Sequence, residues 1–286
     1  MMEFILAQTI DGVVFGMLLF LLAAGLTLML GTMRIVNLAH GSFYVLGGYV
    51  GYSIFQWTQS FLLACLSGLL SIGVLGILTY KAVLDKRFAR AVQSQVLITF
   101  GMIFIISDVC RWIWGGNPLS IPKPQILQGV VSLGSIVVPV YRLAIIAIGT
   151  VILLALWLFQ EKTKYGAIVR AGVDDAEMTQ GIGINISVVK TLVFGLGALL
   201  AGLAGVIGAP FIGLSIGLDF EILLSAIVVV IIGGMGSLRG ALIGALIIGL
   251  VDTFGKSLFP ELSIFTVFAA MVALLAIRPS GLFGTK

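Results

Sequence analysis

The chain has 286 residues, of which 60% are hydrophobic and only 10% are charged. A soluble globular domain carries about 25% charged residues, so the composition excludes a water-soluble protein and indicates an integral membrane protein in a lipid bilayer. The formal net charge of +4 is no sign of nucleic-acid binding, because a basic excess in a membrane protein mostly reflects its cytoplasmic loops.

Apolar runs recur along the whole chain at the length of a membrane helix, about 20 residues. The candidate spans lie at residues 11–32, 38–56, 61–80, 96–114, 141–159, 188–209, 219–235, 240–258 and 262–277. Four glycines weaken a regular helix in the second candidate, which we expect to be broken or partly re-entrant. The sequence therefore predicts an all-α polytopic bundle of about 8–9 transmembrane helices with one broken or re-entrant segment, forming a single domain over residues 1–286.

The stretch MRIVNLAHGSFY, residues 33–44, joins the first two candidate spans and carries the only histidine of the chain, His40. One histidine and two cysteines in apolar segments give no metal site, and no Ser-His-Asp arrangement can be built around His40. Either the polar residues satisfy backbone groups where the next helix is interrupted, or they line or gate a pathway at that interruption. The candidates for a pathway or gate are Asn37, His40, Gly41, Ser42 and Tyr44.

Two polar islands indicate the orientation of the chain. The first carries Lys81, Lys86, Arg87 and Arg90, and the second carries Lys162, Lys164, Arg170 and Lys190. Because basic residues near span ends favour the cytoplasm, both islands and the C-terminus are expected there, with the Pro-, Gly- and Ser-rich segment 115–140 outside. The side of the N-terminus stays open.

The second island is expected to contain a short amphipathic helix. Asp174 and Asp175 suit its positive N-terminal end, with Asp174 as a candidate cap, and Gly181 and Gly183 suit its termination. The residues alone leave open whether this is a solvated loop or a docking helix for a cytoplasmic partner.

Some kinds of chemistry are missing from the sequence. No G-x-x-x-x-G-K-[ST] phosphate loop occurs, so ATP hydrolysis by that route is not expected. Asp219 and Arg239 are assigned to turns between helices, which leaves no charge at the centre of a clear span and disfavours a proton-coupled carrier. Internal repetition is limited to weak echoes near Gly31 and Gly236.

Three blocks of the sequence resemble permease subunits of branched-chain amino acid ABC importers, in the family's order, and look closest to the first of the two permeases in such systems. They are GLTLMLGTMRIVNLAHGSFYVLGGYV, then YGAIVRAGVDDAEMTQGIGIN followed by LVFGLGALLAGLAGVIGAP, then VVVIIGGMGSLRGALIGALIIGL. One departure is Ser42, where many relatives have an acidic residue after His-Gly. The departure leaves the solute open, because the wider family also includes importers of urea, short amides and aromatic acids.

The resemblance implies a multi-pass protein of the bacterial cytoplasmic (inner) membrane that works with a second related permease, two cytoplasmic ATPase subunits and an external solute-binding protein. ATP and Mg would be bound by the partner subunits, so the chain itself is expected to hold no cofactor and to be no enzyme. The solutes implied are branched-chain amino acids or related small polar or amphipathic molecules.

The resemblance also implies that residues 160–187 form a cytoplasmic coupling loop whose helix docks on an ATPase subunit. The residues assigned to this ATPase-coupling helix are Arg170, Ala171, Asp174, Asp175, Glu177, Gly181 and Ile182. Two alternative functions predict other features. A stand-alone secondary transporter or channel predicts mid-span charges and no docking loop, and a membrane-embedded transferase using His40 would need clustered acids or several histidines at one membrane face.

Overall fold

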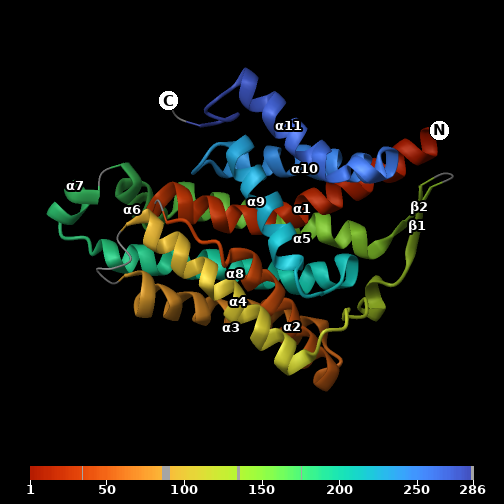
Figure 1. Cartoon of the computed structure of the whole chain (residues 1–286), viewed down its shortest axis with the longest axis horizontal. Helices are drawn as coiled ribbons and strands as arrows, with labels where there is room; N and C mark the ends of the chain where they lie inside the picture. Colours follow the sequence, from red (N-terminus) through yellow and green to blue (C-terminus); the bar gives the residue numbers. More distant parts are fainter. Residues whose placement is uncertain (34, 86–90, 134–135, 175, 285–286) are drawn as a thin grey trace.

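A computed structural model describes residues 1–33, 35–85, 91–133, 136–174 and 176–284 of the chain (Figure 1). Most of these residues are helical, and the described part also contains one β-hairpin, in which β1 (Val130–Leu133) pairs antiparallel with β2 (Ile136–Pro139). The predicted all-α polytopic class is confirmed. The hairpin lies in the segment that the sequence predicted only as an irregular loop between spans.

The helices follow the predicted spans to within a few residues at most boundaries. They are α1 (Met2–Met33), α2 (His40–Thr58), α3 (Phe61–Thr79), α4 (Val92–Trp114), α5 (Val140–Lys162), α6 (Lys164–Asp174), α7 (Ala176–Gly181), α8 (Ile186–Ile212), α9 (Leu218–Gly233), α10 (Leu238–Leu258) and α11 (Ser263–Ile277), with short turns η1 (Tyr80–Leu84), η3 (Gln125–Leu127) and η4 (Pro260–Leu262).

Six helices in the described part of the chain are long and apolar enough to cross a membrane: α1, α3 with η1, α4, α5, α8 and α10. The helices α9 and α11 are shorter, with 16 and 15 residues, and α2 is less apolar than these six. The count of about 8–9 spans therefore stays a prediction, which depends on whether α2, α9 and α11 also cross.

The helices α1 and α8 form the centre of the bundle. In the apolar 18-residue stretch of each of these two helices, 83% and 78% of the residues are buried inside the protein, whereas in the other four long helices the share lies between 17% and 33%. Figure 1 shows α1 and α8 running in opposite directions, with α10 packed on α1 and α3 packed on α8. Neighbouring helices cover α1 and α8 on all sides, so these two helices have no polar face of the kind that a surface helix has.

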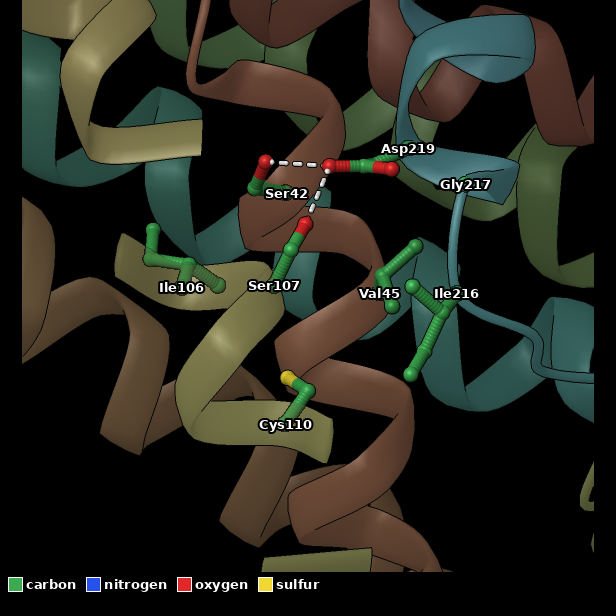
Figure 2. Close-up of a pocket in the computed structure, with 8 residues that line it drawn as sticks. All are labelled: Ser42, Val45, Ile106, Ser107, Cys110, Ile216, Gly217 and Asp219. Atoms are coloured by element: carbon green, nitrogen blue, oxygen red, sulfur yellow. Dashed lines mark hydrogen bonds between the residues drawn. The ribbon is translucent and has the colours of Figure 1, made fainter. Parts of the chain in front are cut away.

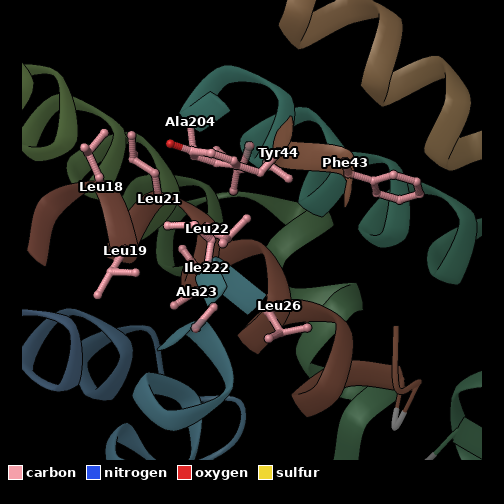
Figure 3. Close-up of a cluster of buried hydrophobic side chains, with 14 of the residues drawn as sticks. Leu18, Leu19, Leu21, Leu22, Ala23, Leu26, Phe43, Tyr44, Ala204 and Ile222 are labelled. Atoms are coloured by element: carbon pink, nitrogen blue, oxygen red, sulfur yellow. The ribbon is translucent and has the colours of Figure 1, made fainter. Parts of the chain in front are cut away.

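A buried apolar cluster joins α1 to the helices around it (Figure 3). Residues 18–23 of α1 are consecutive, yet each is at most 2% exposed, so every face of this part of the helix is covered. Tyr44 of α2, Ala204 of α8 and Ile222 of α9 complete the cluster. The beginning of α2 and the beginning of α9 are therefore both anchored on the middle of α1.

The helix α2 is continuous from His40 to Thr58, so its glycines do not break it. They instead allow close packing on α8: a side chain at Gly47 would overlap the backbone of Gly202, and one at Gly205 would overlap the backbone of Tyr44. Small residues let membrane helices approach in this way. The expectation that the glycines interrupt this helix is therefore wrong, and their role is contact with α8.

The interruption lies ahead of α2. His40 Nε2 is 3.0 Å from the carbonyl oxygen of Leu22, and Leu22 precedes the end of α1 at Met33 by 11 residues. At a rise of 1.5 Å per residue, α2 begins about 16 Å short of the end of α1. The chain thus turns back into the bundle before α2 starts, and a re-entrant course of this segment in the membrane stays a prediction.

The helix α9 begins beside the first turn of α2, because a side chain at Gly41 would overlap the backbone carbonyl of Asp219. Packing partners repeat in the two halves: α10 and α9 pack on α1 as α3 and α2 pack on α8. This pattern is typical of an inverted-topology repeat. The two glycines of the weak sequence echoes, Gly31 and Gly236, pack against each other where the end of α1 meets the turn between α9 and α10.

Candidate functional site

The predicted polar residues at the start of α2 are all buried. Asn37, His40, Ser42 and Tyr44 are each at most 1% exposed. Asn37 and His40 bind backbone groups: Asn37 Oδ1 accepts a hydrogen bond from the Ala39 N–H at 3.1 Å, and His40 Nε2 meets the Leu22 carbonyl. These two contacts match the first of the two interpretations, in which polar side chains satisfy the backbone where the chain is interrupted.

Ser42 faces a different group, the carboxylate of Asp219. Ser42 Oγ donates a hydrogen bond to Asp219 Oδ2 at 2.8 Å, and Ser107 Oγ donates to the same oxygen at 3.2 Å. Figure 2 shows the two hydroxyls converging on this oxygen from α2 and α4, while Asp219 comes from the first turn of α9. One carboxylate oxygen therefore joins three helices at the depth where two of them begin.

A small cavity adjoins this carboxylate. Besides Asp219 and the two serines it is bordered by apolar side chains, among them Val45, Ile106 and Ile216 (Figure 2). Its volume is about 10 Å³, which is room for a single water molecule. The site is closed in this conformation, and a larger molecule can reach the carboxylate only if the three helices separate.

The electrostatics of Asp219 differ from those of other carboxylates in the bundle. Asp219 is 4% exposed and forms no ion pair within the part of the chain that the structure describes. By contrast, Asp11 pairs with Arg142 at 2.5 Å and Asp252 pairs with Lys256 at 2.8 Å. Burying a carboxylate without a cation is costly, and only the two hydroxyls and the positive end of α9 offset that cost here.

Sequence reasoning missed Asp219 and Ser107. Asp219 was assigned to a turn between helices, but it is the second residue of α9 and is buried against α2; Arg239, assigned in the same way, lies in the first turn of α10. The usable signal in the sequence is the pair Gly213 and Gly217 ahead of the apolar run, because glycines mark turns; in the structure both adopt positive φ (+88° and +95°) on either side of a short segment that leads back into the bundle.

The second polar island forms two helices, α6 and α7, where the sequence predicted one. Arg170 lies exposed in α6 and Ala171 is half-buried beside it. Asp174 is the last residue of α6 and Glu177 is the second residue of α7, while Asp175 lies outside the described residues.

The predicted end of the short helix at Gly181 and Gly183 is confirmed, whereas its predicted start is not, because the candidate cap Asp174 is the last residue of the preceding helix α6. The helix α7 ends at Gly181, and Gly183 follows with a φ of +87°, as glycine does in many helix terminations. The side chains of Met178 and Ile182 are each 71% exposed, and a side chain added at Gly181 would meet open space. Two large apolar side chains are therefore exposed at this end of the protein, one in α7 and one directly after it, and neither belongs to a helix long enough to span a membrane.

Fold and site together define a class, a polytopic helical membrane protein with a closed polar junction inside the bundle and a pair of short helices at one end. Residues 8–277 match the family model described as "Branched-chain amino acid transport system / permease component". The chain belongs to this family.

Individual relatives cover almost the whole chain. The high-affinity branched-chain amino acid transport system permease protein of Pseudomonas aeruginosa is 24% identical over an alignment of 299 positions, which covers 98% of this chain and 95% of the relative. The protein with the same description from Escherichia coli K12 is 27% identical over 295 aligned positions, which cover 98% of this chain and 96% of the relative. The ribose import permease protein of Escherichia coli K12 is 28% identical over 282 aligned positions, which cover 90% of this chain and 80% of the relative. No solved structure gives a significant match.

Proposed function

We propose that the chain is the transmembrane permease subunit of an ATP-driven ABC importer, which moves branched-chain amino acids or related small polar or amphipathic solutes. The observation that carries the proposal is the pair α6–α7 with its exposed apolar residues Met178 and Ile182, placed at one end of a bundle whose family is a transport permease family. Exposed apolar side chains on the six long helices can face lipid, whereas α6 and α7 are too short to span the membrane, and a docking partner would cover the apolar side chains exposed there.

In this proposal residues 1–286 form one permease domain in the inner membrane. The six long helices cross the membrane, and α2, α9 and α11 supply the further segments that bring the count to about 8–9. Residues 160–187 form the cytoplasmic coupling loop, and the C-terminus lies on the same side because basic residues flank both. The loop 115–140 with its hairpin then faces outward, where a solute-binding protein docks.

The partners are a second related permease, two cytoplasmic ATPase subunits and an external solute-binding protein. ATP and Mg are bound by the ATPase subunits, and this chain contributes no catalytic residue. The coupling helix uses Arg170, Ala171, Asp174, Asp175, Glu177, Gly181 and Ile182. Asn37, His40, Gly41, Ser42 and Tyr44 form the gate or the lining of the pathway at the start of α2.

A route from the coupling helices to this gate is supported by packing. The helix α6 contacts α5, α1 and α8, and α8 contacts α2 backbone to backbone at Gly205 and Tyr44. When the ATPase subunits close, a shift of α6–α7 moves α8 and with it the start of α2. ATP binding changes the permease only if the ATPases bind one arrangement of α6–α7 better than the other.

Affinity purification of the tagged full-length chain from its native membrane tests the proposal. We expect a second permease subunit and the ATPase subunits to co-purify with it. The purified complex should hydrolyse ATP, and the external binding protein should stimulate this hydrolysis. The chain purified alone should hydrolyse no ATP. A chain that carries solute without any ATPase partner would instead establish the alternative, a stand-alone transporter or channel, and would refute the importer.

A further inference from the structure

The carboxylate of Asp219 needs an explanation that helix packing does not give. It is buried, it has no cation beside it within the described residues, and its Oδ2 accepts hydrogen bonds from Ser42 and Ser107. An asparagine side-chain oxygen would accept the same two hydrogen bonds without any charge. The negative charge is therefore more than the junction of α2, α4 and α9 requires.

The surroundings of the carboxylate indicate what the charge is for. The remaining walls of the cavity are formed by Val45, Ile106 and Ile216 together with Cys110 and Gly217, so the charged group lies beside a mostly aliphatic surface. A solute that fits both features carries a cationic group next to an aliphatic one. An ammonium group suits a carboxylate flanked by hydroxyls, because it brings three donors and one positive charge.

We propose that Asp219 binds the amino group of the transported solute and thereby selects amino-bearing solutes over neutral polyhydroxy solutes. This rests on the proposed importer function. The cavity of about 10 Å³ has room only for a group of the size of water or ammonium, so it receives the amino group when α2, α4 and α9 separate, and the rest of the solute lies outside it. The hydroxyls of Ser42 and Ser107 hold the carboxylate in place until then.

The test compares Asp219→Asn with wild type in the complete importer, co-purified with its ATPases and binding protein and reconstituted in lipid vesicles. Radiolabelled leucine, isoleucine and valine serve as amino-bearing probes and ribose as the neutral probe. Since hydrogen bonds to charged groups contribute roughly ten- to hundredfold in affinity, we expect at least a tenfold fall in amino acid uptake. The ATPase subunits should co-purify with the variant at the wild-type level, because α6 and α7 are unchanged.

Glu221→Gln is the matched control, with the same loss of charge two residues further along α9. Glu221 is directed away from the junction: its side chain is 67% exposed, and its Oε1 lies 3.8 Å from Lys256 Nζ. We expect wild-type uptake from this variant. Equal losses in both variants would assign the effect to general electrostatics of α9 and would overturn the role of Asp219.

A swap variant keeps the question open to experiment if Asp219→Asn fails to assemble. Ser42→Asp combined with Asp219→Ser exchanges the two partners of one hydrogen bond and moves the carboxylate from α9 to α2. Amino acid uptake by this variant supports the proposal, and an assembled swap variant without uptake counts against it.

Two results overturn the inference while leaving the importer function intact. One is amino acid uptake by assembled Asp219→Asn at the wild-type rate, and the other is a wild-type importer that carries ribose and no amino acid. Absence of ATPase partners in the wild-type preparation would instead remove the proposed function and this inference with it.

Discussion

The close contact between α2 and α8 predicts opposite responses to two glycine-to-alanine changes. At Gly205, in α8, an added Cβ would overlap the carbonyl oxygen of Tyr44 and crowd the backbone nitrogen of Gly48. Both neighbours are backbone atoms within α2, so no side chain can rotate out of the way. The helices themselves have to separate to admit a single methyl group.

The magnitude follows from comparison with Gly101, in the interior of α4. An added Cβ at Gly101 meets nothing within 4 Å, so Gly101→Ala gains the usual helix-propensity benefit of about 0.5–1 kcal/mol. Gly205→Ala gains the same benefit but also pays for overpacking, about 1–3 kcal/mol in well-packed interiors. The difference between the two variants isolates the overpacking cost, so Gly205→Ala should be less stable than Gly101→Ala by about 1–3 kcal/mol.

Reversible unfolding in mixed detergent micelles measures this difference. The protein in mild detergent is titrated with a denaturing detergent, and helix content is followed by circular dichroism for wild type and both variants. We expect Gly101→Ala to unfold at or beyond the wild-type midpoint and Gly205→Ala clearly before it. Equal free energies of unfolding for the two variants would show that α2 and α8 are not in backbone contact and would refute the packing argument.

Two further changes test the polar island. At Gly181 an added side chain meets open space, so Gly181→Trp should leave assembly and unfolding unchanged. It should lower the ratio of solute uptake to ATP hydrolysis at least fivefold in the reconstituted importer. A wild-type ratio would refute the docking role of α7. Asn185 caps the N-terminus of α8, where its Oδ1 accepts hydrogen bonds from the Ser187 and Val188 amides at 3.0 and 3.4 Å. Asn185→Ala should lower the free energy of unfolding by about 1 kcal/mol. Faster hydrogen exchange of those two amides, with little change elsewhere, would confirm this.

Much of the bundle could be predicted because lipid imposes a simple rule on length and polarity. The apolar runs became the long helices α1, α3, α4, α5, α8 and α10, since every backbone group inside the membrane must be satisfied within a helix. The end of α7 was predicted for a local reason as well: Gly181 and Gly183 supply a termination that needs no information from distant residues.

The polar junction could not be predicted in the same way, because it depends on depth and on distant pairing. Hydropathy gives the length of an apolar run but not where a helix starts relative to its neighbours. The sequence therefore predicts the residues of α2 but not that its first residue, His40, lies beside Leu22 in the middle of α1. Ser42 and Asp219 are 177 residues apart. Their contact depends on the two connections that lead back into the bundle, residues 35–39 before α2 and residues 213–217 before α9. In the sequence each of them looks like an ordinary connection between helices.

In the proposed importer, the contacts that form the polar junction also let it respond to a shift of α6 and α7. The helix α6 packs on α8, and α8 meets α2 through Gly202 and Gly205 with no flexible side chain between the backbones. A contact of this kind passes on a displacement, because close-packed backbones cannot take up a shift by changing rotamers. Ser42 lies in the first turn of α2 and holds Asp219 at 2.8 Å, so a movement of α8 that carries α2 along acts directly on the hydrogen bond that closes the cavity.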